Sequence, residues 1–562
     1  MTNASSTLSI HPGALGAGVA DLARDLEERR FADALERRDP SAWSADPAVQ
    51  KTIADRLGWL DAPDRVLRDI ADVEQFADAV RREAVADVVL LGMGGSSLAP
   101  EVLRAVIGVR PGWPRFTMVD SVNADHVRSI VVDPRDTLFV LASKSGSTIE
   151  PNVLAAYFRQ RLLDANVTNW AQHFVAITDP GTALDERATR EGFRRVFRNP
   201  PDIGGRYSVL SLFGLVPAAL MGIDVRKLVS DAQQMLAGTR DARTGAALPL
   251  GVLLGAGARN GRDKLTLVLP PALEPLGLWI EQLVAESTGK EGRGIVPVTG
   301  EPLGEVNEYG EDRVFVHVRL PDREDEAMAS AVTALAHAGM PVATIDPDTS
   351  ASLGGEFVRW ELATVTAAAL LSINPFDEPN VKQAKDATRT LLDSFSREGR
   401  LPVPEPDAEI DHAAFTLTTA ARRLLAGAAV DGLLSLLQPG DYLAILAYLP
   451  EGPEIAAAVR SFRATVRGRR RCATTFGYGP RYLHSTGQLH KGGANNGVFL
   501  MLTAPGQDLE APGEGFSFGV LELAQALGDF VSLDHAGRRA LHVHLPRPDA
   551  GTVQRLFDRL LV

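Results

Sequence analysis

The chain has 562 residues, of which 45% are hydrophobic and 23% charged, and its formal net charge at pH 7 is −13. This composition is typical of a folded globular protein and excludes a largely disordered chain, while the length predicts two or three lobes because single cores stop growing at about 250–300 residues. The negative charge argues against general binding to nucleic acid or to anionic membranes, which positive surface potential attracts.

Residues 1–75 are predicted to form a helical N-terminal segment. Residues 22–39, LARDLEERRFADALERRD, have helical periodicity with many charges, and a second amphipathic run follows. The first 18 residues lack a basic start followed by an apolar run, so we expect no secretory signal.

Two α/β domains are predicted next, over residues 76–235 and 236–396. Short apolar runs alternate with helix-length segments, which favours parallel sheets with crossover helices on both faces, a doubly wound α/β/α arrangement. The runs are VADVVLLG, FTMVDS, TLFVLAS and HFVAIT in the first domain, and DKLTLVLP, RVFVHVRLP and MPVATIDP in the second.

A linker and a third portion complete the chain. The proline-rich residues 397–411 are predicted to be a linker, and residues 412–562 an α/β portion with four apolar runs. Its Cys472 is the only cysteine, which excludes an internal disulfide and a multi-cysteine metal site and fits a reducing, cytoplasmic setting. Apolar stretches such as 209–221 are too short to cross a bilayer, so we expect a soluble protein without a membrane partner.

A glycine-rich turn follows the first predicted strand. Gly92, Gly94, Gly95, Ser96 and Ser97 stand between a predicted strand and a predicted helix, where bare backbone amides can approach an anion. Three interpretations stay open: a structural turn, a dinucleotide loop and a sugar-phosphate loop. Asp120 ends the next strand, where a ribose-binding acid would stand, but Ser97 replaces the expected third glycine.

A second polar turn strengthens the sugar-phosphate interpretation. Ser143, Lys144, Ser145, Ser147 and Thr148 follow another predicted strand, and their hydroxyls and ammonium suit the three oxygens of a phosphate monoester. The alternative is an ordinary polar turn in which serines cap a helix.

Together with these two turns, three later motifs resemble the glucose-6-phosphate isomerase family. They are GGRYSVLSLFGL at 204–215, VAESTGKEGRG at 284–294 and SINPFDEPNVKQAK at 372–385. The resemblance covers most of residues 85–390 in the expected order; the C-terminal part is more similar to the isomerase half of bacterial fused transaldolase/glucose-6-phosphate isomerases, although no transaldolase portion is present. It implies two sugar isomerase (SIS) domains, no cofactor or metal, and a homodimer whose two subunits complete each active site.

The implied reaction interconverts glucose 6-phosphate and fructose 6-phosphate through an enediolate. Glu286 matches the family's base, which moves a proton between neighbouring carbons, and burial would raise its pKa toward the working range. Arg206 matches the cation that stabilises the enediolate.

Opening of the sugar ring is implied for Lys385 and a histidine. Lys385 ends the family pattern, but Glu378 stands where glutamine is usual and is expected to pair with Lys385 or to alter contacts with sugar hydroxyls. The histidine motif, LHSTGQLHKGG, lies at 483–493, after the lysine, whereas bacterial relatives have it before the lysine. If it reaches the site, His484 opens the ring with Gln488 binding substrate, assisted by His490 or Lys491.

Other functions stay open at this stage. Glu378 leaves room for another phosphosugar, such as mannose 6-phosphate. A non-catalytic sugar-phosphate sensor would keep the serine turn but lose the base, and an NAD-dependent oxidoreductase would use the glycine turn for its dinucleotide.

Overall fold

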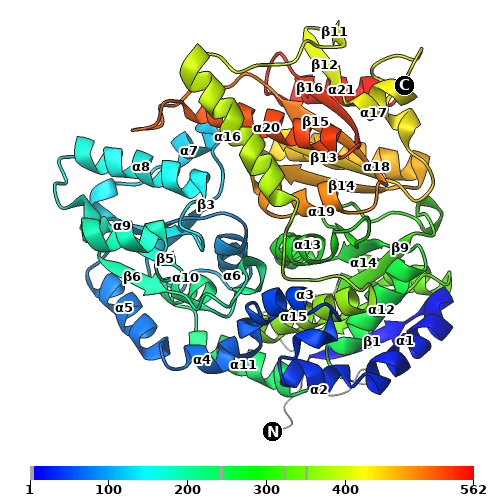
Figure 1. The fold of residues 1–562 in the computed structure, drawn as a ribbon, viewed down its shortest axis with the longest axis horizontal. Coiled ribbons are helices and arrows are strands. Elements are labelled where there is room, and N and C mark those ends of the chain that lie inside the picture. The colour runs from blue at the N-terminus through cyan, green and yellow to red at the C-terminus, as the bar shows by residue number, and fades with distance from the viewer. Residues whose placement is uncertain (1–5, 239–244, 321–324, 348–351) are drawn as a thin grey trace.

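Three sheets with helices packed against them organise the chain (Figure 1). The computed structural model describes residues 6–238, 245–320, 325–347 and 352–562. The predicted α/β class, with two lobes built on parallel strands and a further α/β portion, is confirmed. Within these described residues, no helix is long and apolar enough to span a membrane.

The first sheet is entirely parallel and has the order β3-β2-β4-β5-β6. Its strands are β2 (Asp87–Leu91), β3 (Arg115–Val119), β4 (Thr137–Ala142), β5 (Phe174–Thr178) and β6 (Arg195–Arg198). Helices α5 (Ile70–Arg82), α6 (Leu98–Val106) and α10 (Leu212–Leu220) cover one face, and α7 (Ala124–Ser129), α8 (Ile149–Asp164) and α9 (Ala183–Glu191) cover the other. Every residue of β2 and β4 is buried, which explains their unbroken apolar runs.

The second sheet has the order β1-β10-β9-β7-β8. Strands β7 (Lys264–Val268), β8 (Val296–Val298), β9 (Arg313–Val318) and β10 (Val342–Asp346) are parallel, and β1 (Thr7–His11) pairs antiparallel with β10. The helices of this region are α1 (Gly16–Glu28), α2 (Phe31–Glu36), α3 (Pro47–Ala54), α4 (Ala62–Val66), α11 (Val225–Ala237), α12 (Leu248–Arg259), α13 (Glu274–Thr288), α14 (Glu326–His337) and α15 (Leu353–Leu370).

Strand β1 corrects one expectation, because the N-terminal segment was predicted to be helical throughout. Leu8 and Ile10 alternate with polar residues and pack against the main core, while the strand has only five residues. The longer helical pattern that follows it dominates the sequence signal in this segment.

The third sheet has the order β11-β12-β16-β15-β13-β14. Its strands are β11 (Ala408–Ile410), β12 (Ala413–Leu417), β13 (Tyr442–Tyr448), β14 (Ala473–Tyr478), β15 (Gly497–Thr503) and β16 (Arg539–His544), the last four of them parallel. The helices here are α16 (Val381–Glu398), α17 (Thr419–Leu424), α18 (Pro453–Arg470), α19 (Gly487–Gly492), α20 (Phe518–His535) and α21 (Ala550–Leu560).

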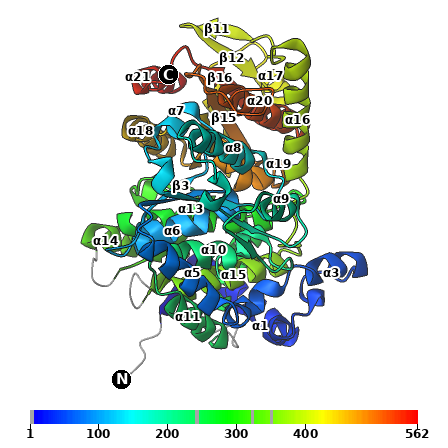
Figure 2. The same cartoon turned by 90° about the vertical axis from the view of Figure 1, so that its left-hand side faces the viewer.

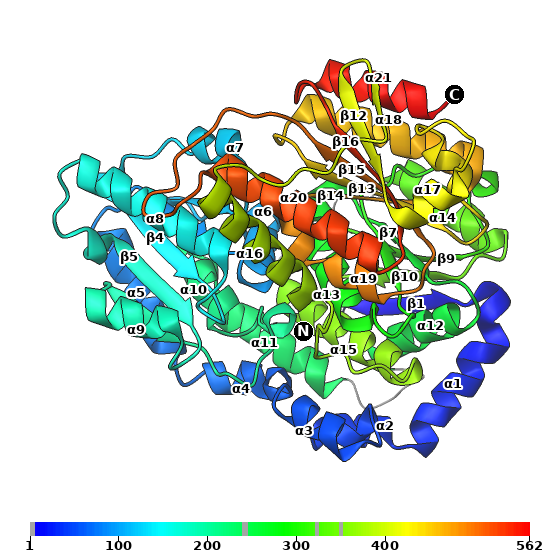
Figure 3. The ribbon, with the colours of Figure 1, turned by 45° about the horizontal axis from the view of Figure 1, so that its top comes forward.

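The third sheet and its helices lie over the other two sheets, as Figure 2 shows from the side. Helix α16 packs along α20, and Figure 3 shows these two helices side by side above α13 and α19. The predicted domain limits remain predictions, although α5 crosses the limit at 75 and α16 crosses the one at 396. The packing of α16 and α19 brings the C-terminal part of the chain to the loops of the first sheet.

Candidate active site

The two polar turns follow neighbouring strands of the first sheet, at the point where its strand order reverses. In open α/β sheets, ligands bind in the crevice at this switch point. Gly94 has a φ of +55°, and a Cβ there would lie 2.9 Å from the carbonyl oxygen of His484. A Cβ on Gly95 would lie 2.1 Å from the carbonyl oxygen of Gly205. The glycines thus let this turn pack directly against the segments that carry His484 and Arg206.

The second turn leads into the N-terminus of α8. The Ser143 hydroxyl donates to Thr148 Oγ1 at 3.2 Å, and Thr148 precedes the helix without capping it through its side chain. Ser145 Oγ accepts hydrogen bonds from Ser147. A cavity of about 160 Å³ is lined at this end by Ser147, Thr148, Ile149 and Glu150. The start of α8 therefore borders an open space with its partial positive charge.

Lys144 does not join this cavity, contrary to the expected convergence of its ammonium with the hydroxyls. Its Nζ forms an ion pair with Asp179 and donates to the carbonyl oxygen of Pro201 at 3.0 Å. Burial raises the pKa of Asp179, and the Lys144 ammonium opposes that rise. The lysine side chain is thus engaged on the neighbouring strand-end loop.

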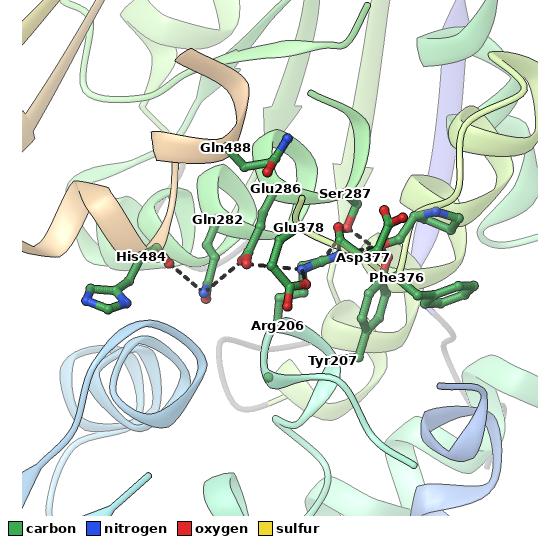
Figure 4. Close-up of polar contacts among 12 residues, drawn as sticks. Arg206, Tyr207, Gln282, Glu286, Ser287, Phe376, Asp377, Glu378, His484 and Gln488 are labelled. Carbon is green, nitrogen blue, oxygen red and sulfur yellow. Dashed lines mark hydrogen bonds and ion pairs between the residues drawn. The ribbon is translucent and has the colours of Figure 1, made fainter. Parts of the chain in front are cut away.

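Glu286 and Arg206 meet near the end of α13. Glu286 lies in the last turn of α13, and Arg206 lies in a short 3₁₀ helix, Gly205–Tyr207. Arg206 Nη1 lies 3.1 Å from Glu286 Oε1, and the two side chains are only 4% and 14% exposed (Figure 4). The predicted base and the predicted cation are therefore in direct contact in a largely desolvated site.

Glu378 binds the same guanidinium nitrogen instead of pairing with Lys385. Its Oε2 accepts a hydrogen bond from Arg206 Nη1 at 3.1 Å. Burial raises the pKa of Glu286, Arg206 opposes the rise, and the second carboxylate, Glu378, adds to it. Burial alone would lower the pKa of Arg206, but Glu286 and Glu378 outweigh it and raise that pKa.

The displaced histidine motif does reach the site. His484 ends a short 3₁₀ helix after β14, and its Nε2 lies 2.8 Å from Glu150 Oε1. Gln525 Nε2 also donates to Glu150 Oε1, at 2.6 Å. Burial alone would raise the pKa of Glu150, but His484 and then Lys385 outweigh it, so the pKa lies below its ordinary value. The ionised carboxylate only accepts, so the Nε2 of His484 carries a hydrogen and donates it to Glu150.

Lys385 lines the same cavity as His484 and Glu150. Gln282 links this cavity to Glu286, because its Nε2 donates to the carbonyl oxygen of His484 at 2.8 Å and to Glu286 Oε2 at 3.3 Å. Figure 4 shows Gln282 between His484 and Glu286. The two halves of the site, Glu286 with Arg206 and His484 with Lys385, are therefore contiguous.

Comparisons with known proteins identify the family. Residues 70–299 match the family model for phosphoglucose isomerase. Glucose-6-phosphate isomerases of Rubrobacter xylanophilus and Thermus thermophilus are each 30% identical; the matches cover 63% and 64% of this chain and 91% and 97% of those proteins. This chain belongs to the glucose-6-phosphate isomerase family.

Solved structures agree on the fold of this family member. A hypothetical protein of Thermus thermophilus aligns with a TM-score of 0.57 at 26% identity, over 68% of this chain and 99% of that one. A glucose-6-phosphate isomerase of Chlamydia trachomatis aligns with a TM-score of 0.55 at 18% identity, over 69% and 87%, which supports the fold alone. Each of these matches leaves about a third of this chain unmatched.

Gln488 is not available to substrate, although the family resemblance suggested a binding role. Its Nε2 donates to the carbonyl oxygen of Gly289 at 2.9 Å and to Asn380 Oδ1 at 2.8 Å, and its Oε1 accepts from the Asn380 amide at 2.9 Å. The side chain is fully buried. It ties α19 to the end of α13 and to the start of α16, which carries Lys385.

Two further expectations around the histidine motif are corrected. His490 is a core residue packed against Tyr442, Tyr482 and Phe499, and burial holds its pKa well below the ordinary value. Lys491 lines the cavity, but its Nζ binds Asp529 Oδ1 at 2.6 Å.

Asp120, the candidate ribose-binding acid, is also engaged. It accepts two hydrogen bonds of 2.7 Å from Arg481 and is 1% exposed. Arg481 begins the 3₁₀ helix that ends at His484. The acid therefore anchors the histidine segment to the first sheet, which removes the main support for a dinucleotide site.

Glu150, Gln282 and Gln525 are site residues that the sequence did not single out. Gln282 stands one helical turn before Glu286. In a helix this spacing puts the two side chains on the same face, so the sequence could have indicated Gln282 as a neighbour of Glu286. Glu150 and Gln525 gave no such signal, because a glutamate in the first turn of a helix and a glutamine in an amphipathic helix are both ordinary. Their partners lie 334 and 375 residues away along the chain.

Proposed function

We propose that this chain interconverts glucose 6-phosphate and fructose 6-phosphate as an aldose–ketose isomerase. The contact between Glu286 and Arg206 carries the proposal, because it joins a buried carboxylate base to a permanent cation in the motifs of this family. Among the described residues, no group of three or more His, Cys, Asp or Glu side chains could hold a metal ion. The steps below use side chains of this chain alone.

Glu286 moves the proton between carbons 1 and 2 of the open-chain sugar. A carboxylate whose pKa is raised is a stronger base and accepts a proton nearer neutral pH. Removal of the proton leaves negative charge on the enediolate oxygens. Arg206 stabilises that charge more than it stabilises the neutral carbonyl, which lowers the barrier.

His484 and Lys385 open the sugar ring before isomerisation. Glu150 holds His484 through Nε2, so Nδ1 is left as the acceptor for a sugar hydroxyl proton. Lys385, which lines the same cavity, supplies a proton to the ring oxygen. Lys491, which lines the cavity, is held by Asp529 and does not share this role.

The phosphate group binds at the N-terminus of α8. Ser143, Ser145 and Thr148 offer hydroxyls there, together with the first amides of the helix. Gly94 and Gly95 pack against the segments that carry His484 and Arg206, and with Ser96 they are proposed to bind the sugar phosphate through the turn that they form. Lys144 contributes at most through its backbone, since its ammonium is paired with Asp179.

A homodimer and a cytoplasmic location complete the proposal. The single cysteine and the family resemblance support them. The family resemblance implied that two subunits complete each site, but Glu286, Arg206, Lys385 and His484 lie together within one chain here, so the proposed chemistry needs no residue from a partner.

The test is turnover of fructose 6-phosphate by chelator-treated protein, followed through glucose 6-phosphate with a coupled dehydrogenase. Glu286→Gln should lower kcat by several orders of magnitude at unchanged fold, because the amide cannot accept the proton. Turnover that survives in this variant would remove Glu286 as the base. Turnover of mannose 6-phosphate alone by a well-folded parent would show that the proposed substrate is wrong. Binding of fructose 6-phosphate without turnover would favour a non-catalytic sensor.

A further inference from the structure

The guanidinium of Arg206 is surrounded by acceptors: it donates four hydrogen bonds and forms an ion pair with Glu286. A guanidinium offers five N–H groups, and five acceptors surround the three nitrogens of Arg206. They are Ser287 Oγ at Nε, Glu286 and Glu378 at Nη1, and the carbonyl oxygens of Pro375 and Asp377 at Nη2. A new negative oxygen at Nη1 would therefore compete with the two carboxylates that already face this nitrogen.

Glu378 is the acceptor best able to leave. Ser287 is fully buried, and the two carbonyl oxygens belong to the chain that leads into α16. Glu286 must stay, because it is the proposed base. The side chain of Glu378, by contrast, is 47% exposed and can rotate into water. Its loss from Nη1 would free one N–H beside Glu286, where the enediolate oxygens form.

Lys290, a second cation near Glu378, donates its hydrogen bonds to other groups. The ammonium of Lys290, one turn beyond Glu286, binds Asp377 Oδ1 at 2.7 Å and the carbonyl oxygen of Asn374 at 2.6 Å. The Lys290 ammonium is therefore paired with the carboxylate of Asp377. The Glu378 carboxylate instead contacts Arg206 Nη1, at 3.1 Å.

We propose that Glu378 is a displaceable counterion that occupies Arg206 until a sugar phosphate binds, and that it thereby sets the affinity of the site for its anionic substrate. The inference deepens the proposed function and rests on it. Binding exchanges the ion pair between Arg206 and Glu378 for a contact between Arg206 and the substrate. The exchange costs affinity because the ion pair between Arg206 and Glu378 is lost when the substrate enters.

The loss of the ion pair weakens substrate binding and does not slow the chemical step. Glu378 leaves when the substrate enters. The ion pair is therefore absent from both the bound ground state and the transition state, and the free energy of each is raised by the same amount. Such a uniform effect changes KM while kcat stays nearly constant. A residue that held sugar hydroxyls would behave in the opposite way, because its replacement would weaken binding.

The first experiment compares the parent with Glu378→Gln, which keeps the shape and removes the charge. We expect KM for fructose 6-phosphate to fall by about threefold to tenfold, the size of one screened ion pair, at similar kcat. Glu291→Gln is the matched control, because that carboxylate is 64% exposed and pairs with Arg293 instead of Arg206. The control should leave KM unchanged. Salt at 0.5 M should reduce the difference in KM between the parent and Glu378→Gln, because it screens the ion pair.

A binding measurement separates this inference from the proposed reaction. The probe is a five-carbon aldonic acid 5-phosphate, whose carboxylate resembles the enediolate in charge, and its Kd is measured by calorimetry. Tighter binding to Glu378→Gln than to the parent supports a displaced counterion, whether or not turnover is seen. Equal or weaker binding, or a raised KM, would overturn it. Absence of turnover in the parent would count against the isomerase and not against the counterion.

Discussion

Glu286 and Glu378 face the same nitrogen of Arg206, and the charge of Glu378 adds to the raised pKa of Glu286. The motif alone predicted Glu286 and Arg206, because each stands at a fixed place in a family pattern. The motif placed Glu378 near the site but not on Arg206, since a side-chain partner is set by rotamer and packing. Glu150 was missed for the same reason, because its partner comes from a distant part of the chain.

The pH dependence of turnover should report this arrangement. Glu286 must be ionised to act as base, and burial raises its pKa, so activity should fall as pH drops through a value above about 4.3, the ordinary glutamate pKa. Glu378 adds to that rise, and Glu378→Gln should therefore move the acid limb of kcat/KM to lower pH. The measurement is kcat/KM against pH for both proteins. An acid limb that stays in place in the variant would contradict the coupling.

At the scale of elements, the buried strands were predictable and their connections to the site were not. The runs that became β2, β4, β7 and β9 are apolar because both faces of their sheets are covered. The edge strand β1 has only five residues, so its alternation of apolar and polar residues is short. The longer helical periodicity after it dominates the prediction for this segment. Helix α19 was visible only as a polar, glycine-bounded loop, so neither its helical turn nor the role of Gln488 could be predicted.

Gln488 should act as a structural tie whose loss affects Lys385 and Glu286 together. Gln488→Ala removes three buried hydrogen bonds and leaves groups of Gly289 and Asn380 unpaired. We expect the free energy of unfolding to fall by about 1–3 kcal/mol. Urea denaturation of this variant, of Asn380→Ala and of the double variant measures it. Because the two side chains share one contact, their effects should not add, and simple additivity would rule out the tie.

For the molecule as a whole, the part of the chain after residue 412 supplies a catalytic group to a site built by the first two sheets. The order of motifs in the sequence left it open whether His484 reaches that site. The packing of η12, the 3₁₀ helix Arg481–His484, and of α19 decides it, through Arg481 with Asp120 and Gln488 with Asn380. Such contacts between distant segments have no local sequence signal.

This assembly predicts that two damaged chains cannot repair each other. A Glu286→Gln chain mixed with a His484→Ala chain should show no more activity than the two measured separately, even after joint unfolding and refolding. Each chain carries both residues of its own site, so any dimer would contain only defective sites. Recovery of activity on mixing would instead mean that His484 acts across a subunit boundary. Refolded parent protein is the control for recovery.

Strand β1 also bears on how the chain folds as it is made. Thr7 leaves the ribosome early, but its partner Asp346 follows 339 residues later. At a synthesis rate of about 5–20 residues per second, β1 waits roughly 17–70 s for the edge strand that it covers. The second sheet therefore closes only after the first sheet has been synthesised completely.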